Sequence, residues 1–376
     1  MALGSKETCP AITVGAVYGA ERVIGTSTFH DLTVILCCVF SGVVFLTSGL
    51  HVFLHATYLS RPGEQIKIIR IILMVPVFAL VYLIAALFLH AAVYLQPWAD
   101  LYESIALASY FLLLVTYCEP VSARQDEFFD ALGHEHGKSN LRLLRRTWVY
   151  VFQYVPTSFI VALATDVTQA KGLYCANGSG IHFAHQWLTG FRCISVALAF
   201  LALLDFYRHL RYQLNPFHVV SKLTALKGIV VIDFAQRITF TVLSATNTVL
   251  PSSKLSYNDI YYGIPSIIIC GVMVFFSVYH LYAYSASPYM GRSSQYQGGR
   301  FGLKGLRMAL NPGEMVAGIA QAGRILVGRG RQERRLHSSD DTPSVPPTAP
   351  PKGQKAAYGQ HEIVDQWLRG GFLGGL

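Results

Sequence analysis

Seven stretches of mostly apolar residues, each close to twenty residues long, dominate this sequence. They cover residues 32–54, 69–92, 100–118, 148–166, 190–207, 223–245 and 260–284. A helix needs about 20 such residues to cross the hydrocarbon core of a bilayer. Charged residues make up only 14% of the chain, against roughly 25% in an ordinary soluble domain. The sequence therefore predicts an all-α integral membrane protein, a bundle of seven transmembrane helices, and excludes an ordinary soluble enzyme.

The lysines and arginines are distributed unevenly between these stretches. Twenty-three of the 30 lie in alternate loops and in the region after residue 285, and four lie on the opposite side. Lysine and arginine are enriched on the cytoplasmic side of membrane proteins. The bundle is therefore predicted to have its N-terminus outside and its C-terminus in the cytoplasm. The net charge of +9 follows this pattern and indicates a membrane surface rather than nucleic acid.

The same pattern divides the chain into four predicted regions. Residues 1–31 are an extracellular or lumenal N-terminus, and residues 32–284 are the seven-helix membrane domain. Residues 285–335 are predicted to contain a cytoplasmic amphipathic helix and a basic cluster. Residues 336–376 are predicted to be a disordered tail, because Ser, Pro, Thr and Lys dominate its first half.

A helix is predicted after the last span, over residues 311–328, with Asn311 as its N-cap and Pro312 in its first turn. Apolar residues then recur at helical spacing: Met315, Ile319, Ala322 and Leu326. The basic cluster that follows consists of Arg329, Arg331, Arg334 and Arg335. Residues 311–335 are thus predicted to bind anionic lipids of the inner leaflet. The alternative, a helix packed under the bundle, is equally compatible with the sequence.

A few residues are candidates for modification or metal binding. Asn177 begins a glycosylation sequon in a loop predicted to lie outside, so the chain is predicted to be a glycoprotein. Cys9 and Cys175 are both predicted outside, and whether they pair is left open. His51 and His55 lie four residues apart without an evident third ligand, so we interpret them as histidines at the membrane interface. The sequence predicts no bound metal and no cofactor.

Polar side chains inside the predicted spans bear most directly on function. An ionisable group at the bilayer centre costs several kcal/mol, so by default it faces the bundle interior. The sixth span is the richest, and its Asp233 and Arg237 are four residues apart. These two side chains can therefore form a local ion pair that only stabilises the bundle. The alternative is that they line a pathway for a solute. We predict a polar cavity between the third, fourth, fifth and sixth spans, with these substrate-binding residues: Glu103, Gln153, Tyr154, Lys227, Asp233 and Gln236.

Several short motifs occur in order along the chain. They are Arg70 to Pro76, Asp100-Leu-Tyr-Glu103, Gln153-Tyr154 before Pro156, Ser195 to Tyr207, then Pro216, Lys222, Lys227 and Gln236, and finally Asn311-Pro312. In this order they resemble the organic solute transporter alpha and transmembrane protein 184 family, seven-span proteins of eukaryotic membranes, over about residues 35–328. The chain departs from the family pattern at Ala235, where a tryptophan is usual, and at Val272, where an acidic residue is common. These departures indicate a divergent member, and the motif after the last span indicates a fungal one.

The resemblance and the polar residues within the spans imply a facilitative transporter of amphipathic organic solutes, sterol-like or lipid-like. It is expected in an endomembrane, such as that of the vacuole, or in the plasma membrane. No nucleophile–base constellation is evident, so the chain is not expected to be an enzyme. The alternative is a seven-span receptor or a signalling or trafficking scaffold without transport activity. The sequence leaves a homo- or hetero-oligomer open.

Overall fold

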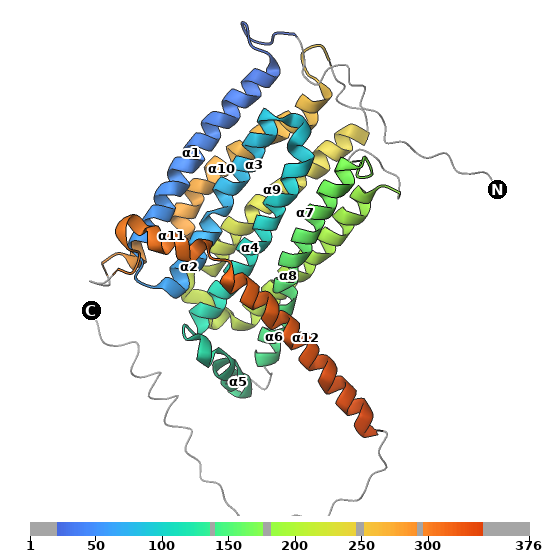
Figure 1. Ribbon diagram of the computed structural model, residues 1–376. Helices are drawn as coiled ribbons and strands as arrows, with labels where there is room; N and C mark the ends of the chain where they lie inside the picture. Colours follow the sequence, from blue (N-terminus) through green and yellow to red (C-terminus); the bar gives the residue numbers. More distant parts are fainter. Residues whose placement is uncertain (1–20, 136–139, 176–181, 246–251, 292–295, 341–376) are drawn as a thin grey trace, which may run out of the picture. The chain divides into compact units, whose positions relative to one another are not determined.

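The computed structural model describes residues 21–135, 140–175, 182–245, 252–291 and 296–340, and these residues form α-helices joined by short turns (Figure 1). The helices are α1 (Phe29–Thr57), α2 (Pro62–Ile72), α3 (Met74–Leu87), α4 (Ala92–Cys118), α5 (Gln125–Glu135), α6 (Asn140–Phe152), α7 (Tyr154–Ala170), α8 (Ala184–Leu214), α9 (Val219–Ala245), α10 (Ile264–Ala283), α11 (Leu303–Leu310) and α12 (Gly313–Asp340). No β-strand occurs in these ranges. The all-α prediction is confirmed.

Six helical stretches are long and apolar enough to cross a membrane. They are Phe29–Thr57, Pro62–Leu87, Leu89–Cys118, Asn140–Ala170, Ala184–Phe217 and Asp259–Tyr289. These correspond to six of the seven spans that the sequence predicts. The helix at the remaining position, α9, is formed but is not among the six, and it carries Lys222, Lys227, Asp233 and Arg237. A seventh span and the orientation of the bundle therefore remain predictions.

Three spans contain a break close to the proline that the sequence places in them. Leu73 separates α2 from α3 three residues before Pro76, and Gln153 separates α6 from α7 three residues before Pro156. A proline ring clashes with the carbonyl of the residue four positions earlier and cannot donate a backbone hydrogen bond. Pro265 follows a single π-helical turn, Asp259–Gly263, at the start of α10. These breaks redirect the helices and expose backbone carbonyls to cross-helix partners.

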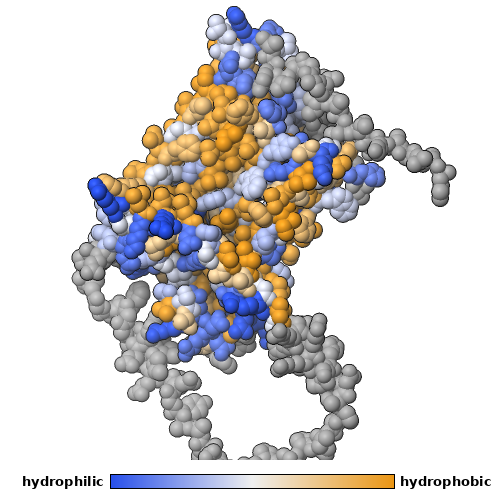
Figure 2. All heavy atoms as spheres, viewed as in Figure 1, coloured by the Kyte–Doolittle hydropathy of each residue, from blue (hydrophilic) through white to orange (hydrophobic). Residues whose placement is uncertain are grey.

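Helix α4 lies at the centre of the bundle and contacts α2, α3, α7, α8 and α9. Nearly all its side chains from 99 to 117 are buried. Its neighbour α3 also packs against α1 and α10. The outer surface is apolar instead: Leu46 is 77% exposed, Phe275 65% and Ile194 64%. Figure 2 shows hydrophobic residues gathered over the helices on this face. Such a surface would be costly in water and fits the interior of a bilayer.

The segment after α10 approaches α1 closely, and glycines make the approach possible. A Cβ atom added to Gly298 would lie 1.9 Å from the backbone oxygen of Ala56, and one added to Gly305 would lie 2.8 Å from it. Gly302 also faces Ala56 and has a φ of +73°, which favours glycine. Helix α11 is thereby held against the end of α1, beside the turn between α1 and α2.

The predicted cap of α12 is confirmed, because the Asn311 side chain accepts a hydrogen bond from the Gly313 amide at 2.9 Å. Two observations favour the packed helix over the lipid-bound one for the first turns of α12. The Trp148 indole donates to the Gly318 carbonyl at 2.9 Å, and Met315 and Ala322 are buried. The basic cluster at 329–335 belongs to a second unit of the chain, and its side chains lie outside the described residues.

An ion pair fixes the start of α12 to α2. Glu314 contacts Lys67 Nζ at 3.2 Å and forms a second ion pair with Arg70. Burial acts to raise the pKa of Glu314, but the positive charges of Lys67 and Arg70 outweigh it and hold that pKa below its usual value. The carboxylate therefore stays ionised at neutral pH. Arg70 also donates from Nε to the Ala309 carbonyl at 2.7 Å, which links α11 to the same site.

Candidate functional site: a buried charge network between five helices

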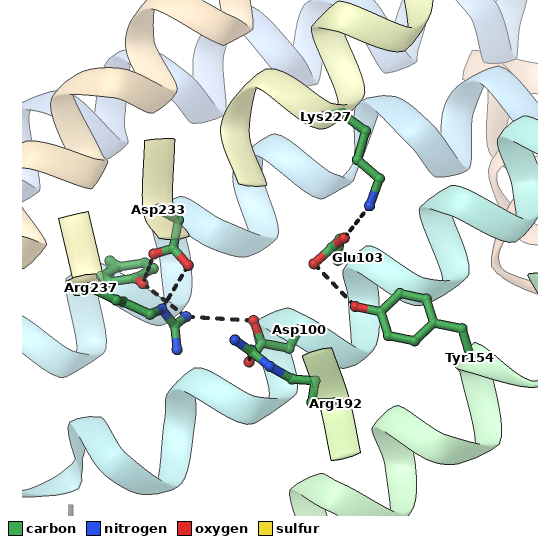
Figure 3. A network of polar contacts seen from close by, with 8 residues as sticks. Asp100, Glu103, Tyr154, Arg192, Lys227, Asp233 and Arg237 are labelled. Carbon is green, nitrogen blue, oxygen red and sulfur yellow. Dashed lines mark hydrogen bonds and ion pairs between the residues drawn. The ribbon is translucent and has the colours of Figure 1, made fainter. Parts of the chain in front are cut away.

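Charged side chains from three helices meet inside the bundle, together with one tyrosine from each of two others (Figure 3). Helix α4 contributes two carboxylates, α8 contributes an arginine, and α9 contributes both signs of charge. The members of this charge network are Tyr82, Asp100, Glu103, Tyr154, Arg192, Lys227, Asp233 and Arg237.

One half of the charge network is centred on Glu103. Its Oε1 atom lies 2.5 Å from Lys227 Nζ, and its Oε2 atom accepts a hydrogen bond from the Tyr154 hydroxyl at 3.3 Å. Glu103 is 3% exposed and Lys227 is 8% exposed. The Lys227 ammonium also lies 5.6 Å from the centre of the Phe200 ring. Both charges are thus removed from solvent and depend on each other.

The other half joins α3, α4, α8 and α9. Asp233 accepts hydrogen bonds from Tyr82 and from Arg237 Nε, the latter at 2.8 Å. Arg237 also reaches Asp100, with 3.5 Å between Nη2 and Oδ1. Arg192 of α8 binds the other oxygen of Asp100. The local ion pair between Asp233 and Arg237 therefore exists, but it is one part of a larger arrangement that spans four helices.

The charges of the network balance. Three carboxylates (Asp100, Glu103 and Asp233) face three cations (Arg192, Lys227 and Arg237). A single buried charge costs several kcal/mol, and a paired one costs less. Apolar residues of similar volume would hold helices together at least as well. Stability alone is therefore a poor explanation for six ionisable groups at this place.

Two of the predicted site residues lie apart from the charge network. Gln153 accepts from the Ser195 hydroxyl at 2.9 Å and donates to the Ser195 carbonyl at 3.0 Å, which ties the α6–α7 break to α8. Gln236 donates to the Pro265 carbonyl at 3.0 Å, beside the π-helical turn of α10. Gln153 is itself the residue at the α6–α7 break, whereas Gln236 binds a carbonyl beside the break in α10. The other four, Glu103, Tyr154, Lys227 and Asp233, come together as network members.

The comparison with known families decides what kind of protein carries this network. The sequence profile of the family described as organic solute transporter Ostalpha matches residues 33–289. The chain belongs to this family. The predicted resemblance is confirmed, although the Asn311-Pro312 motif lies beyond the matched residues. The chain is a multi-pass membrane protein of a family of organic solute transporters, and the whole charge network falls within the matched region.

A curated relative is a vacuole membrane protein of Schizosaccharomyces pombe, hfl11, which is 23% identical over 278 residues. The alignment covers 68% of this chain and 62% of the relative. The chain thus spans less than two thirds of the length of that protein. No solved structure matches this chain.

Sequence reasoning missed half of the network of this family member. Asp100 and Arg192 are charged residues near one end of their predicted spans. The rule that buried charges pair would have predicted a contact between them. Arg237 was considered only as the partner of Asp233. Tyr82 carries no sequence signal, since a tyrosine in an apolar span is ordinary. The polar cavity between the third, fourth, fifth and sixth spans stays a prediction, because the side chains of the charge network contact one another in this structure.

The remaining candidates from the sequence are two histidines, two cysteines and the glycosylation sequon. His51 and His55 are buried, and both place Nε2 near the Tyr284 carbonyl, at 3.0 and 2.8 Å. In the described part of the chain, no group of three His, Cys, Asp or Glu side chains is arranged to hold a metal ion. Cys175 is disulfide-bonded. Cys9 and Asn177 lie outside the described residues.

Proposed function

We propose that this chain is a facilitative transporter of amphipathic organic solutes with a sterol-like or lipid-like body. The observation that carries the proposal is the charge network, which gathers six ionisable side chains of α4, α8 and α9 inside the helix bundle of an organic solute transporter family member. Ionisable residues in such helices mark solute pathways more often than structural ties. With no internal repeat evident in the sequence, we expect transport to run downhill in both directions.

The pairing of the network suggests how a polar head group is handled. Within the described part of the chain, Lys227 pairs with one carboxylate, that of Glu103 on a different helix. An acidic solute head could replace that carboxylate at Lys227 without leaving the cation unpaired, provided that the Glu103 side chain turns away from Lys227. Aromatic walls such as Phe200 would contact the apolar body. Glu103, Tyr154, Lys227 and Asp233 are thus proposed as substrate-binding, with Gln153 and Gln236 supporting the pathway at the helix breaks.

A flux measurement tests the transport function directly. The purified full chain is reconstituted in vesicles, and efflux of a labelled sterol conjugate with one acidic group is followed. We expect Lys227→Gln to reduce flux at least tenfold and Gln236→Leu to reduce it less. Arg124→Gln, a change of an exposed residue outside the spans, is the control and should transport normally. If the unmodified chain moves no amphipathic solute, the scaffold function becomes the better explanation.

We further propose that α9 is the seventh span. Its charges Lys227 and Asp233 are buried, whereas Val231, Phe234 and Val242 are 64%, 48% and 53% exposed. Charges facing inward and apolar residues facing outward suit a helix whose surroundings are lipid. With seven spans the two ends of the bundle lie on opposite sides, and the distribution of lysine and arginine places the C-terminus in the cytoplasm.

Labelling of introduced cysteines tests this topology. An impermeant thiol reagent added to intact cells or sealed vesicles should label Lys254→Cys without permeabilisation. It should label Arg124→Cys only after permeabilisation. Both residues are exposed, and the labelling of the unmodified chain is subtracted. Labelling of both from the same side would contradict a seventh span. The name of the fission yeast relative leads us to propose an endomembrane, that of the vacuole, as the location.

A further inference from the structure

Two hollows adjoin at α11, away from the charge network. One, of about 350 Å³, lies between α1, the α2–α3 break and the start of α11. Apart from Ser48, its lining side chains are apolar, and Gly49 opens it along α1. The other, of about 600 Å³, is lined by Leu303, Leu306, Arg307, Leu310 and Asn311. Leu306 lines both, so an apolar hollow meets one that carries a cation.

The position of these hollows corresponds to the level of a bilayer surface. The first candidate span ends at Thr57 and the second begins at Pro62, so the turn between them emerges from the membrane. The glycines 298, 302 and 305 hold the segment of α11 against Ala56, immediately before that turn. Phospholipid phosphates lie at this depth, and acyl chains extend from there along α1 toward the bilayer centre.

The exposed surface of this segment is both basic and apolar. Arg300, Lys304 and Arg307 are exposed, and residues 300–310 include no acidic side chain. Between these cations, Phe301 and Leu303 are each 65% exposed. Cations alternating with exposed apolar side chains complement a ligand that has an anionic head and an apolar body. A neutral ligand would leave the three positive charges without a counterpart.

We propose that this is a binding site for an anionic phospholipid. One acyl chain occupies the apolar hollow along Gly49, and the phosphate and anionic head group are held by Lys304 and Arg307. Guanidinium and ammonium groups are the usual phosphate partners in proteins. The cations of this site precede the tail segment 311–335, and the site does not depend on the proposed transport function.

The head group is tested by lipid titration of the purified full chain in detergent, with bound lipid counted by native mass spectrometry. The probes are dioleoyl phosphatidylserine and dioleoyl phosphatidylcholine. We expect phosphatidylserine to bind at least tenfold more tightly. Each basic residue near an anionic surface contributes about fivefold in affinity, so Lys304→Gln with Arg307→Gln should weaken phosphatidylserine binding about 25-fold. Arg124→Gln with Lys254→Gln removes the same charge elsewhere and should have no effect.

The acyl chain is tested at Gly49. Gly49 lines the apolar hollow, and a Cβ atom added there meets nothing within 4 Å, so Gly49→Leu is the change chosen to fill it. We expect it to weaken phosphatidylserine binding about tenfold, the equivalent of roughly two buried methylenes. Gly42→Leu is the matched control, because Gly42 also has open space on α1 but does not line the hollow.

Either result can overturn the proposal. Equal binding of the two phospholipids by the unmodified chain would show that the site does not select an anionic head group. Equal binding by Gly49→Leu and Gly42→Leu would show that the hollow holds no acyl chain. If Gly49→Leu fails to fold, the charge variants still decide the head group, and loss of phosphatidylserine selectivity in them alone supports the site.

Discussion

Replacing Glu103 by Gln is expected to destabilise the bundle strongly. Lys227 would remain buried without the one carboxylate that it pairs with among the described residues, which is 2.5 Å away in the native chain. Breaking a buried ion pair by removing one partner costs about 3–5 kcal/mol. In a chain of this size that corresponds to a fall in Tm of roughly 5 °C. Thermal unfolding of the purified chain in detergent, followed by tryptophan fluorescence, measures this fall in Tm.

A double-mutant cycle shows whether the pair is the cause. Lys227→Met should be as destabilising as Glu103→Gln, whereas the double variant should recover most of the lost Tm, because neither charge is then left unpaired. The matched control is Arg145→Gln, which breaks an ion pair with Asp126 whose side chains are 50% and 63% exposed. An exposed pair contributes less than about 1 kcal/mol. A Glu103→Gln variant as stable as this control would contradict the prediction.

The same variants separate a structural network from a transporting one. If the pair only ties α4 to α9, the stable double variant transports as well as the native chain. If Lys227 receives the acidic head of the solute, the double variant is stable and inactive. Thermal stability therefore tests whether the ion pair ties α4 to α9, and flux tests whether Lys227 receives the solute. The double variant answers both questions.

The membrane helices could be predicted from the sequence because lipid imposes a simple rule on each segment separately. A stretch such as 69–92 must satisfy its backbone within itself, and about 20 apolar residues suffice. The breaks near Pro76 and Pro156 were predictable for a similar reason, since proline acts on the residue four positions before it. Each of these features depends on local sequence alone.

The partners within the charge network could not be predicted in the same way. Asp100 and Arg192 are 92 residues apart in the chain, and only the packing of α4 against α8 brings them together. Hydropathy predicts how deep in the bilayer a charged residue lies. It does not predict toward which neighbouring helix the side chain points. Gln153 and Gln236 were predicted to line the same cavity, yet their side chains bind Ser195 and the Pro265 carbonyl instead of the network.

Helix α12 illustrates a different limit. Its cap at Asn311 is a local feature and was predicted, but its surroundings were not. An apolar stripe of the type Met315 to Leu326 fits a membrane surface and a protein surface equally well. The structure separates them through contacts to distant residues, Arg70 with Glu314 and Trp148 with Gly318. Leu326, at the far end of the stripe, is 53% exposed, and lipid binding by that part of the helix stays a prediction.

Replacing Gly298 by Ala is expected to release α11 from α1. The new Cβ atom would lie 1.9 Å from the backbone oxygen of Ala56, and backbone cannot turn aside as a side chain can. Overpacking of this kind costs about 1–3 kcal/mol, so the docked form should open up to about 100-fold more often. Amide hydrogen exchange of residues 296–310 measures how often α11 opens. The amides of Gln297 and Lys304, bonded to Leu59 and Gly298 in the docked form, should exchange fastest.

The control for this variant is Gly323→Ala, since a Cβ atom at Gly323 meets nothing within 4 Å and alanine favours a helix. It should leave exchange near α11 unchanged. Gly302 and Leu306 line the apolar hollow, so releasing α11 removes one wall of the proposed phospholipid site. Gly298→Ala should therefore also weaken phosphatidylserine binding, although it changes no charge. Normal lipid binding alongside fast exchange would place the acyl chain on α1 and α3 alone. Slow exchange in Gly298→Ala would mean that the close contact with Ala56 does not hold α11 in place.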